Sequence, residues 1–227
     1  SREKFTLDPK IVQIVLETFI KMYQEKDSRG NRMAYQGVRV INWCPRCATA
    51  LSDFEVEYKQ EKAPLYWLKY GPFILATTRP ETKLGDTAVA VHPDDPRYQK
   101  MVGEKYAIPG VLGEFEIVVV ADRSVDPQFG SGAIKVTPGH DFNDYEISLR
   151  HNLPIKQIID EKGLMMENCG PYAGLTTQQA RQTIVRDMEK KGLIDHIDQN
   201  YVHNLAICER CKSTIEPIPS KQWFVNV

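Results

Sequence analysis

Four of the five cysteines form two pairs with the same spacing, Cys44-Pro-Arg-Cys47 and Cys208-Glu-Arg-Cys211. A Cys-x-x-Cys turn places two thiolates on one side of a metal ion, and two such turns complete the tetrahedral sulfur set that zinc favours. Such a site would be structural, because four protein ligands leave no open position for a reacting molecule. Two alternatives stay open: four reduced cysteines without a metal, and a disulfide framework. Cys169 has no such partner and is expected to be a free thiol.

The two cysteine pairs are far apart in the sequence. A stretch of 160 residues separates Cys47 from Cys208. The halves of one metal site can meet across such a distance if the stretch between them is a domain whose ends lie close together. We therefore expect a domain at about residues 53–203, inserted into a small metal-bearing stem formed by residues 1–52 and 204–227.

Two other segments combine hydroxyl, basic and acidic side chains, Thr77–Thr82 and Gly130–Glu146. Each has an alternative structural reading. Threonines are common in strands, and an aspartate at a helix N-cap with an acid three residues later, as at Asp141 and Asp144, is a capping pattern. His140 is either a general base or an orienting and packing residue. Neither segment contains a cysteine or a Gly-x-Ser-x-Gly motif, so no covalent nucleophile is evident.

These segments must be positioned by strands and helices. Asp8 and Pro9 mark the start of a helix whose buried face is predicted from apolar residues at helical spacing, namely Ile11, Ile14, Val15, Phe19 and Met22. From about residue 53 the pattern changes to β-rich runs, at 73–78, 87–91, 116–121 and 133–137. Helices are expected from residue 140 to about 151, and from a cap at Thr176 or Thr177 to a stop at Gly192. The predicted fold class is α+β, a mixed β-barrel-like domain with packed helices.

Composition excludes some classes of protein. The net charge is −1, from 29 basic and 30 acidic residues, so the chain has no overall attraction to nucleic acid. The longest apolar run, Ile117 to Ala121, is far shorter than the roughly 20 residues of a membrane-spanning helix. No apolar signal segment follows the charged start, so a cytoplasmic location without membrane contact is expected.

The polar segments resemble the two signatures of the editing domains of valyl-tRNA synthetases. Thr77-Thr78-Arg79-Pro80-Glu81-Thr82, followed by residues 84–93, is similar to the first signature, and residues 130–146 are similar to the second. Residues 42–47 and 220–225 fit the same family on either side, so the resemblance covers essentially the whole chain. Glu81 and the Phe-Asn pair at 142–143 separate it from the leucyl and isoleucyl enzymes. Lys83, where an apolar residue is common, and the long tract 27–35 depart from the pattern.

The resemblance implies hydrolysis of threonine wrongly attached to tRNA(Val). It assigns Asp144 to the α-ammonium of the amino acid, and Lys135 and Arg79 to the ester carbonyl and to the phosphate or ribose of the terminal adenosine. Asp141 would contact the substrate hydroxyl or support the site, and Glu81 would orient Arg79. The implied catalytic residues are Thr78, Lys135, Asp141 and Asp144, and the implied substrate-binding residues are Thr77, Arg79, Glu81, Thr82, Thr137 and His140.

The expected chemistry is attack of an activated water on the aminoacyl ester, assisted by the vicinal ribose hydroxyl, with no cofactor for the reaction. The chain has no His-x-Gly-His or Lys-Met-Ser-Lys-Ser motif, so ATP would be used only by the full enzyme. The implied partners are the aminoacylated 3′ end of tRNA(Val), threonine, and the rest of the synthetase in cis. Alternatives are editing in the leucyl or isoleucyl sense, and a tRNA-binding module without catalysis.

Overall fold

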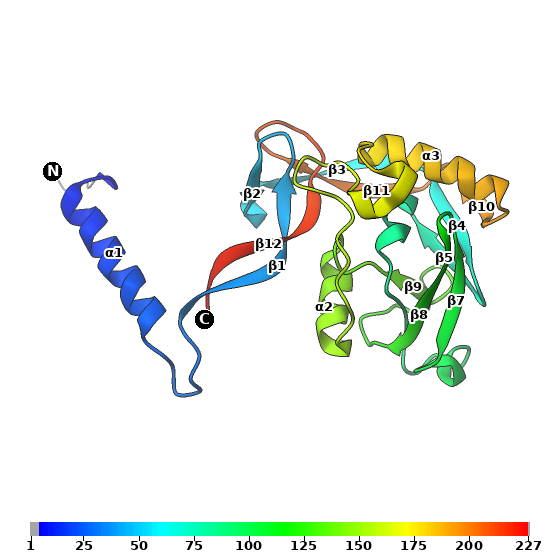
Figure 1. The fold of residues 1–227 in the computed structure, drawn as a ribbon, viewed down its shortest axis with the longest axis horizontal. Helices are drawn as coiled ribbons and strands as arrows, with labels where there is room; N and C mark the ends of the chain where they lie inside the picture. Colours follow the sequence, from blue (N-terminus) through cyan, green and yellow to red (C-terminus); the bar gives the residue numbers. More distant parts are fainter. Residues whose placement is uncertain (1–4, 227) are drawn as a thin grey trace. The chain divides into compact units, whose positions relative to one another are not determined.

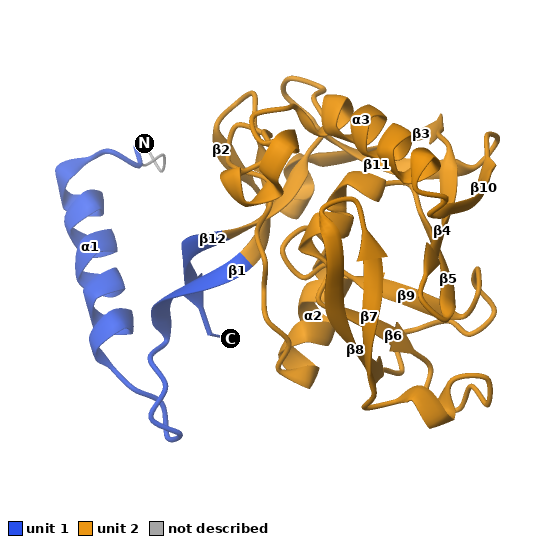
Figure 2. Ribbon diagram, turned by 45° about the vertical axis from the view of Figure 1, so that its right-hand side comes forward, with its two compact units in different colours: residues 1–39, 220–227 blue, residues 40–219 orange. Residues whose placement is uncertain are grey.

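The computed structural model describes residues 5–226, which form two compact units (Figures 1 and 2). Unit 1 consists of residues 1–39 and 220–227, and unit 2 of residues 40–219. All four paired cysteines belong to unit 2. The stem expected at 1–52 and 204–227 includes residues 1–4 and 227, which lie outside the described residues.

Unit 1 contains helix α1, Pro9–Gln24, together with the outer ends of β1, Ala34–Cys44, and β12, Glu216–Val225 (Figure 2). The predicted helix start is confirmed, because the Asp8 side chain accepts a hydrogen bond of 2.9 Å from the backbone nitrogen of Lys10. The ring of Trp223 lies edge-on to the ring of Phe19, with centroids 5.0 Å apart.

The buried face predicted for this helix is wrong. No residue of α1 is buried, and Ile14 and Val15 are 58% and 59% exposed. The physical reason is that an apolar helix stripe becomes buried only against a second layer of structure. Unit 1 consists of this helix and two strand ends, which offer too little apolar surface to cover the stripe.

Unit 2 contains most of the strands, arranged in small sheets (Figure 1). In one sheet, β1 pairs with β2, Thr49–Leu51, and also lies beside β12. In a second, β3, Val56–Lys62, pairs with β11, Val202–Cys208. A third has the order β10-β4-β5, with bounds Ile194–Asp198, Leu65–Tyr70 and Phe73–Thr77. The fourth has the order β7-β8-β6-β9, with bounds Lys105–Gly110, Gly113–Ala121, Ala88–Val91 and Ala133–Val136.

The α+β class is confirmed, but the barrel-like closure is wrong. Within residues 5–226 the strands lie in four separate sheets, and none of these closes on itself. A barrel requires one continuous hydrogen-bonded ladder that joins its first strand to its last. Here the four-stranded sheet ends at β7 and β9 and the β10-β4-β5 sheet ends at β10 and β5, with no ladder between these edges.

Two further helices belong to unit 2, and both were predicted. Helix α2 is Phe142–His151, and α3 is Thr177–Lys190 with a capping box between Thr176 and Gln179. The apolar side of α3 lies in a core cluster through Ala180, Ile184 and Met188. The 3-10 helices are η1 Asp53–Glu55, η2 Pro80–Gly85, η3 Gln99–Met101 and η4 Glu167–Tyr172. In the described part of the chain, none of the helices has the length and apolar character needed to cross a membrane.

Lys83, which departs from the family pattern, is buried in η2. It is 3% exposed, and its Nζ lies 3.6 Å from the centroid of the Tyr70 ring. Within the described residues this Nζ has no hydrogen-bond partner. Burial lowers the pKa of Lys83 from its ordinary value of 10.5 to about 7.

Replacing Lys83 with methionine is therefore expected to stabilise the protein. The unfolded chain holds the Lys83 proton up to about pH 10.4, whereas the folded chain releases it near pH 7, so this lysine lowers stability most at and below neutral pH. We expect Lys83→Met to raise the free energy of unfolding at pH 7 by on the order of 3 kcal/mol. The gain should shrink as the pH rises toward 10.

Urea titrations at pH 7 and 9.5 measure this effect. Lys105→Met is the matched control, because the Lys105 side chain is 65% exposed and should change stability little. A loss of stability in Lys83→Met would show instead that the contact between the amine and the Tyr70 ring outweighs the cost of burial.

Candidate functional site

The two polar segments meet because of the register of the four-stranded sheet. Strand β6 begins directly after η2, and it pairs antiparallel with β9 so that Ala88 lies opposite Val136. The backbone nitrogen of Thr87 donates to the carbonyl oxygen of Val136 at 2.9 Å. The end of the first segment therefore lies beside the residues that follow β9, about 50 positions later in the chain.

Lys135 lies at the centre of the resulting cluster. Its Nζ donates to Thr137 Oγ1 at 2.6 Å and to Thr82 Oγ1 at 3.0 Å, and it lies 3.5 Å from Asp86 Oδ1. The Lys135 side chain is 11% exposed, whereas Thr82 and Thr137 are almost fully buried. The sequence thus brings together the ammonium and the two hydroxyls that the resemblance assigned to the ester.

Asp144 completes this cluster from the first turn of α2. Its Oδ2 accepts the backbone N–H of Thr137 at 2.7 Å, and its own backbone nitrogen donates to Asp141 Oδ1 at 3.0 Å. Asp141 is thus the N-cap of α2, and it is exposed while Asp144 is buried. Burial, and after it the neighbouring Asp141 carboxylate, raises the pKa of Asp144 to about 7.

A second cluster binds the first segment to α3 and β12. Arg79 donates to Glu81 at 3.0 Å and to Glu216 at 2.6 Å, and Arg181 donates to both carboxylate oxygens of Glu81 at 2.8 Å. Glu81 is completely buried; burial alone would raise its pKa, but the hydrogen bonds and charges of Arg181 and Arg79 lower it. Arg79 is thus oriented by Glu81, as the resemblance implied, and the Arg79 backbone nitrogen donates to Thr77 Oγ1 at 3.0 Å.

His140 bridges three parts of the chain through both ring nitrogens. Nε2 accepts the backbone N–H of Ile158 at 2.9 Å, and Nδ1 lies 3.0 Å from the carbonyl oxygen of Pro217. The preceding residue is glycine because a Cβ at Gly139 would lie 2.6 Å from the carbonyl oxygen of Lys156. Burial, followed by the charge of Arg79, lowers the pKa of His140 to about 3. These contacts favour the orienting role over the general base.

A cleft of about 430 Å³ opens beside these clusters. Its walls come from both signatures, from the start of α3, and from the strands near the C-terminal cysteine pair. Its lining divides the predicted site residues into two groups, because Thr78, Arg79, His140 and Asp141 face the cleft whereas the Lys135 cluster does not line it. The groups are connected, since Thr82 Oγ1 donates to the Arg79 carbonyl oxygen at 2.9 Å and Asp141 caps the turn that holds Asp144.

The structure adds residues to which the sequence gave no role. Asp86 accepts hydrogen bonds from Tyr70 and Thr137, and Arg181 and Glu216 hold the Arg79–Glu81 pair. Asp86 lies in the quoted segment 84–93, so its presence there was a usable signal. Nothing in the local sequence distinguishes Arg181 or Glu216 from solvated helix or strand residues.

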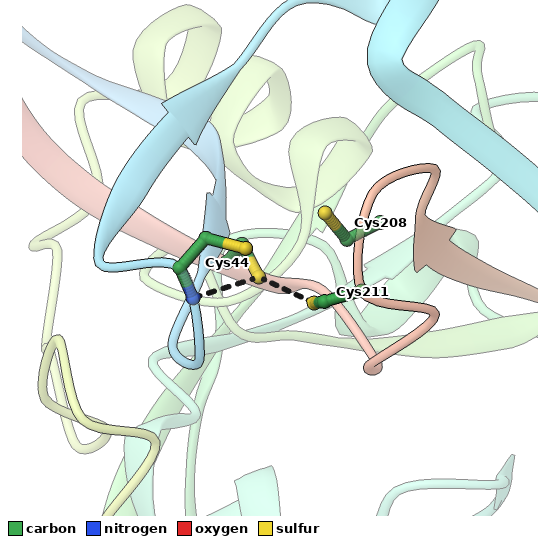
Figure 3. A group of neighbouring side chains, drawn as sticks. Cys44, Cys208 and Cys211 are labelled. Carbon is green, nitrogen blue, oxygen red and sulfur yellow. Dashed lines mark hydrogen bonds between the residues drawn. The ribbon is translucent and has the colours of Figure 1, made fainter.

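The paired cysteines converge in unit 2, at the ends of β1 and β11 (Figure 3). The four Sγ atoms of Cys44, Cys47, Cys208 and Cys211 all lie within 4.8 Å of one another. In a tetrahedral zinc site with bonds of about 2.3 Å, sulfur atoms lie about 3.8 Å apart, so the donor set fits a metal ion. The residue after each pair has a left-handed backbone, with φ of 50° at Ala48 and 58° at Lys212, which shows that the two turns are equivalent.

The sequence also matches known proteins along its whole length. Residues 1–227 match the family described as tRNA synthetases class I (I, L, M and V). The chain is 48% identical to valine–tRNA ligase of Thermotoga maritima, 47% to that of Dehalococcoides mccartyi and 48% to that of Streptomyces avermitilis, in each case over 100% of this chain. These matches cover 26%, 25% and 25% of the relatives, so the chain spans about a quarter of their length. The chain therefore belongs to the class I tRNA synthetases of this group, with valine–tRNA ligases as relatives at almost half identity throughout.

Proposed function

We propose that this chain is the editing part of a valine–tRNA ligase and hydrolyses the ester of threonine on tRNA(Val). The observation that carries the proposal is the cluster of Lys135, Thr82, Thr137 and Asp144, a set of polar groups converging beside a 430 Å³ cleft. Ligation of valine with ATP belongs, in this proposal, to the remainder of the protein.

A polar cluster suits this substrate for a thermodynamic reason. A hydrophobic synthetic pocket rejects the isosteric threonine by only about 10²-fold, a figure that the general literature on valyl-tRNA synthetase itself supplies. A hydrogen-bonding pocket reverses the preference, because valine would leave its buried polar groups unpaired at a cost of about 1–3 kcal/mol. The side chains at Thr82, Thr137 and Lys135 provide such groups.

The proposed roles follow from charge and position. Burial disfavours the charge of Asp144, so a substrate α-ammonium next to this carboxylate would relieve an unfavourable state of the free protein. The Lys135 ammonium would stabilise the negative charge that develops on the ester carbonyl oxygen. Asp141 and Thr78, which face the cleft, would contact the substrate or the attacking water, and Arg79 the terminal ribose or phosphate.

The test is deacylation by the full-length protein, with Thr-tRNA(Val) as substrate and Val-tRNA(Val) and Ile-tRNA(Leu) as controls. Loss of threonine with valine spared is the expected result. No hydrolysis of any of the three would overturn the proposal in favour of a tRNA-binding module, and hydrolysis of Ile-tRNA(Leu) alone would assign the leucyl type of editing.

The pH dependence is a separate prediction. Because the pKa of Asp144 in the free protein is about 7, kcat/KM for Thr-tRNA(Val) should rise as the pH increases through 7 and the carboxylate forms. The measurement is kcat/KM between about pH 5.5 and 8, corrected for spontaneous hydrolysis at each pH. Asp144→Asn should lack this rise, and since both proteins act on the same substrate, titration of the substrate cannot explain a difference between them.

We further propose that the metal of the four-cysteine site is zinc. The sulfur donors and the closed four-ligand set favour a structural role rather than participation in hydrolysis. When bound, the ion would tie the end of β1 to the end of β11 on either side of the residues that form the cleft.

A further inference from the structure

Asp86 lies behind the Lys135 cluster, away from the lining of the cleft. It is 5% exposed, and its side chain is buried completely. Three groups converge on its carboxylate. Tyr70 donates its hydroxyl to Oδ2 at 2.5 Å, Thr137 donates its hydroxyl to Oδ1, and Lys135 lies 3.5 Å from the same Oδ1.

These contacts determine the direction of every hydrogen bond in the cluster. An ammonium only donates, whereas a carboxylate and a carbonyl oxygen only accept. The Thr137 proton therefore points to Asp86, and the Thr82 proton points to the Arg79 carbonyl oxygen at 2.9 Å. Lys135 fills one lone pair on each of the two hydroxyls.

Each threonine hydroxyl then has a single lone pair left for a ligand. The cluster consequently presents acceptors at Thr82 and Thr137, and it recognises a donor on the substrate. The side-chain hydroxyl of threonine and an α-ammonium are donors. The methyl group that valine has in place of the hydroxyl is not.

We propose that Asp86, held in place by Tyr70, is a positioning residue that orients the Thr137 hydroxyl and the Lys135 ammonium and so makes the pocket selective for a hydrogen-bond donor. The inference rests on the proposed editing function, and it names the feature of that site that distinguishes threonine from valine. Asp86 acts through Thr137 and Lys135 and does not itself touch the substrate.

The experiment uses the full-length protein with Asp86→Asn and Tyr70→Phe. In Asp86→Asn we expect kcat for Thr-tRNA(Val) to fall by about tenfold or more with KM changed by less than about threefold, because the tRNA contacts lie elsewhere. Tyr70→Phe should have a smaller effect of about threefold in the same direction, since it removes one of the donors to Asp86. Tyr70→Phe also keeps the test decisive if Asp86→Asn fails to fold.

The chain offers a matched control in a second buried tyrosine–aspartate pair. The Tyr172 hydroxyl donates to Asp187 Oδ2 at 2.9 Å, and neither residue lines the cleft. Tyr172→Phe should leave kcat and the preference for threonine unchanged, even if it lowers the melting temperature as much as Tyr70→Phe does.

Selectivity is measured separately from hydrolysis, by binding of stable amide analogues in which threonine or valine is joined to 3′-amino-3′-deoxyadenosine. The unaltered protein should prefer the threonyl amide, and Asp86→Asn should lose most of that preference. The double variant Asp86→Asn/Thr137→Val should be no worse than Thr137→Val alone, because the two residues act in one path.

The two proposals fail in different ways. Preferential binding of the threonyl amide without hydrolysis of Thr-tRNA(Val) would overturn the proposed function and leave the role of Asp86 supported. Active protein whose kcat and threonine preference survive both Asp86→Asn and Tyr70→Phe would overturn the role of Asp86 alone.

Discussion

Asp144→Asn is expected to lower deacylation of Thr-tRNA(Val) by at least about 100-fold. The reason is that removal of one partner from a buried, hydrogen-bonded charge pair costs about 3–5 kcal/mol. The amide keeps an oxygen for the backbone N–H of Thr137, which Asp144 accepts at 2.7 Å, so the turn before α2 should survive. The measurement is kcat/KM under single-turnover conditions with the full-length protein.

Glu146→Gln is the matched control for this variant. It makes the same acid-to-amide change on the same helix, but Glu146 is exposed. Its deacylation rate should equal that of the unaltered protein. If Asp144→Asn is folded and deacylates at the normal rate, Asp144 does not bind the substrate ammonium, and its role is confined to the hydrogen bond with Thr137.

Loss of the metal is the second change with a large expected effect. The full-length protein should contain one tightly held zinc ion in the four-cysteine site, and Cys208→Ser should abolish stoichiometric binding there. Because binding energy at a structural zinc site is also folding energy, we expect this substitution or exhaustive chelation to cost several kcal/mol, on the order of 3 kcal/mol. Metal content by elemental mass spectrometry and unfolding of the same samples are the two readouts.

Cys169→Ser provides the control for the metal experiment. Cys169 is the remaining cysteine, buried in a separate core cluster with Ile158 and Met165. Its replacement is expected to lower stability through lost packing while metal content stays at one ion per chain. Equal metal content in Cys208→Ser and Cys169→Ser would contradict the four-cysteine site.

The secondary structure was predictable wherever short-range signals agree. Asp8 and Pro9 start α1, Thr176 starts α3 through its capping box, and the β-rich runs at 73–78 and 133–137 are strands. These signals depend on residues within one turn or one strand of each other, so the sequence contains them in full. The convergence of the two cysteine pairs was also predictable, because a four-ligand site demands it.

The failures concern surfaces that meet another surface. The apolar stripe of α1 predicts a buried face, but periodicity says nothing about whether the covering layer is present in the same unit. Barrel closure is a property of the ladder between the outermost strands, such as β7 and β9, and no local pattern encodes it.

By itself the sequence determined which residue types carry the chemistry. The side chains at Lys135, Thr137 and Asp144, and the two cysteine pairs, are recognisable from their order and spacing, and their family membership follows from the whole chain. Only the tertiary structure decided how those groups are held. Asp86 reaches Thr137 across 51 positions, and Arg181 reaches Glu81 across 100. Such contacts depend on sheet register and helix packing, which are settled by burial of the whole core and not by neighbours in the chain.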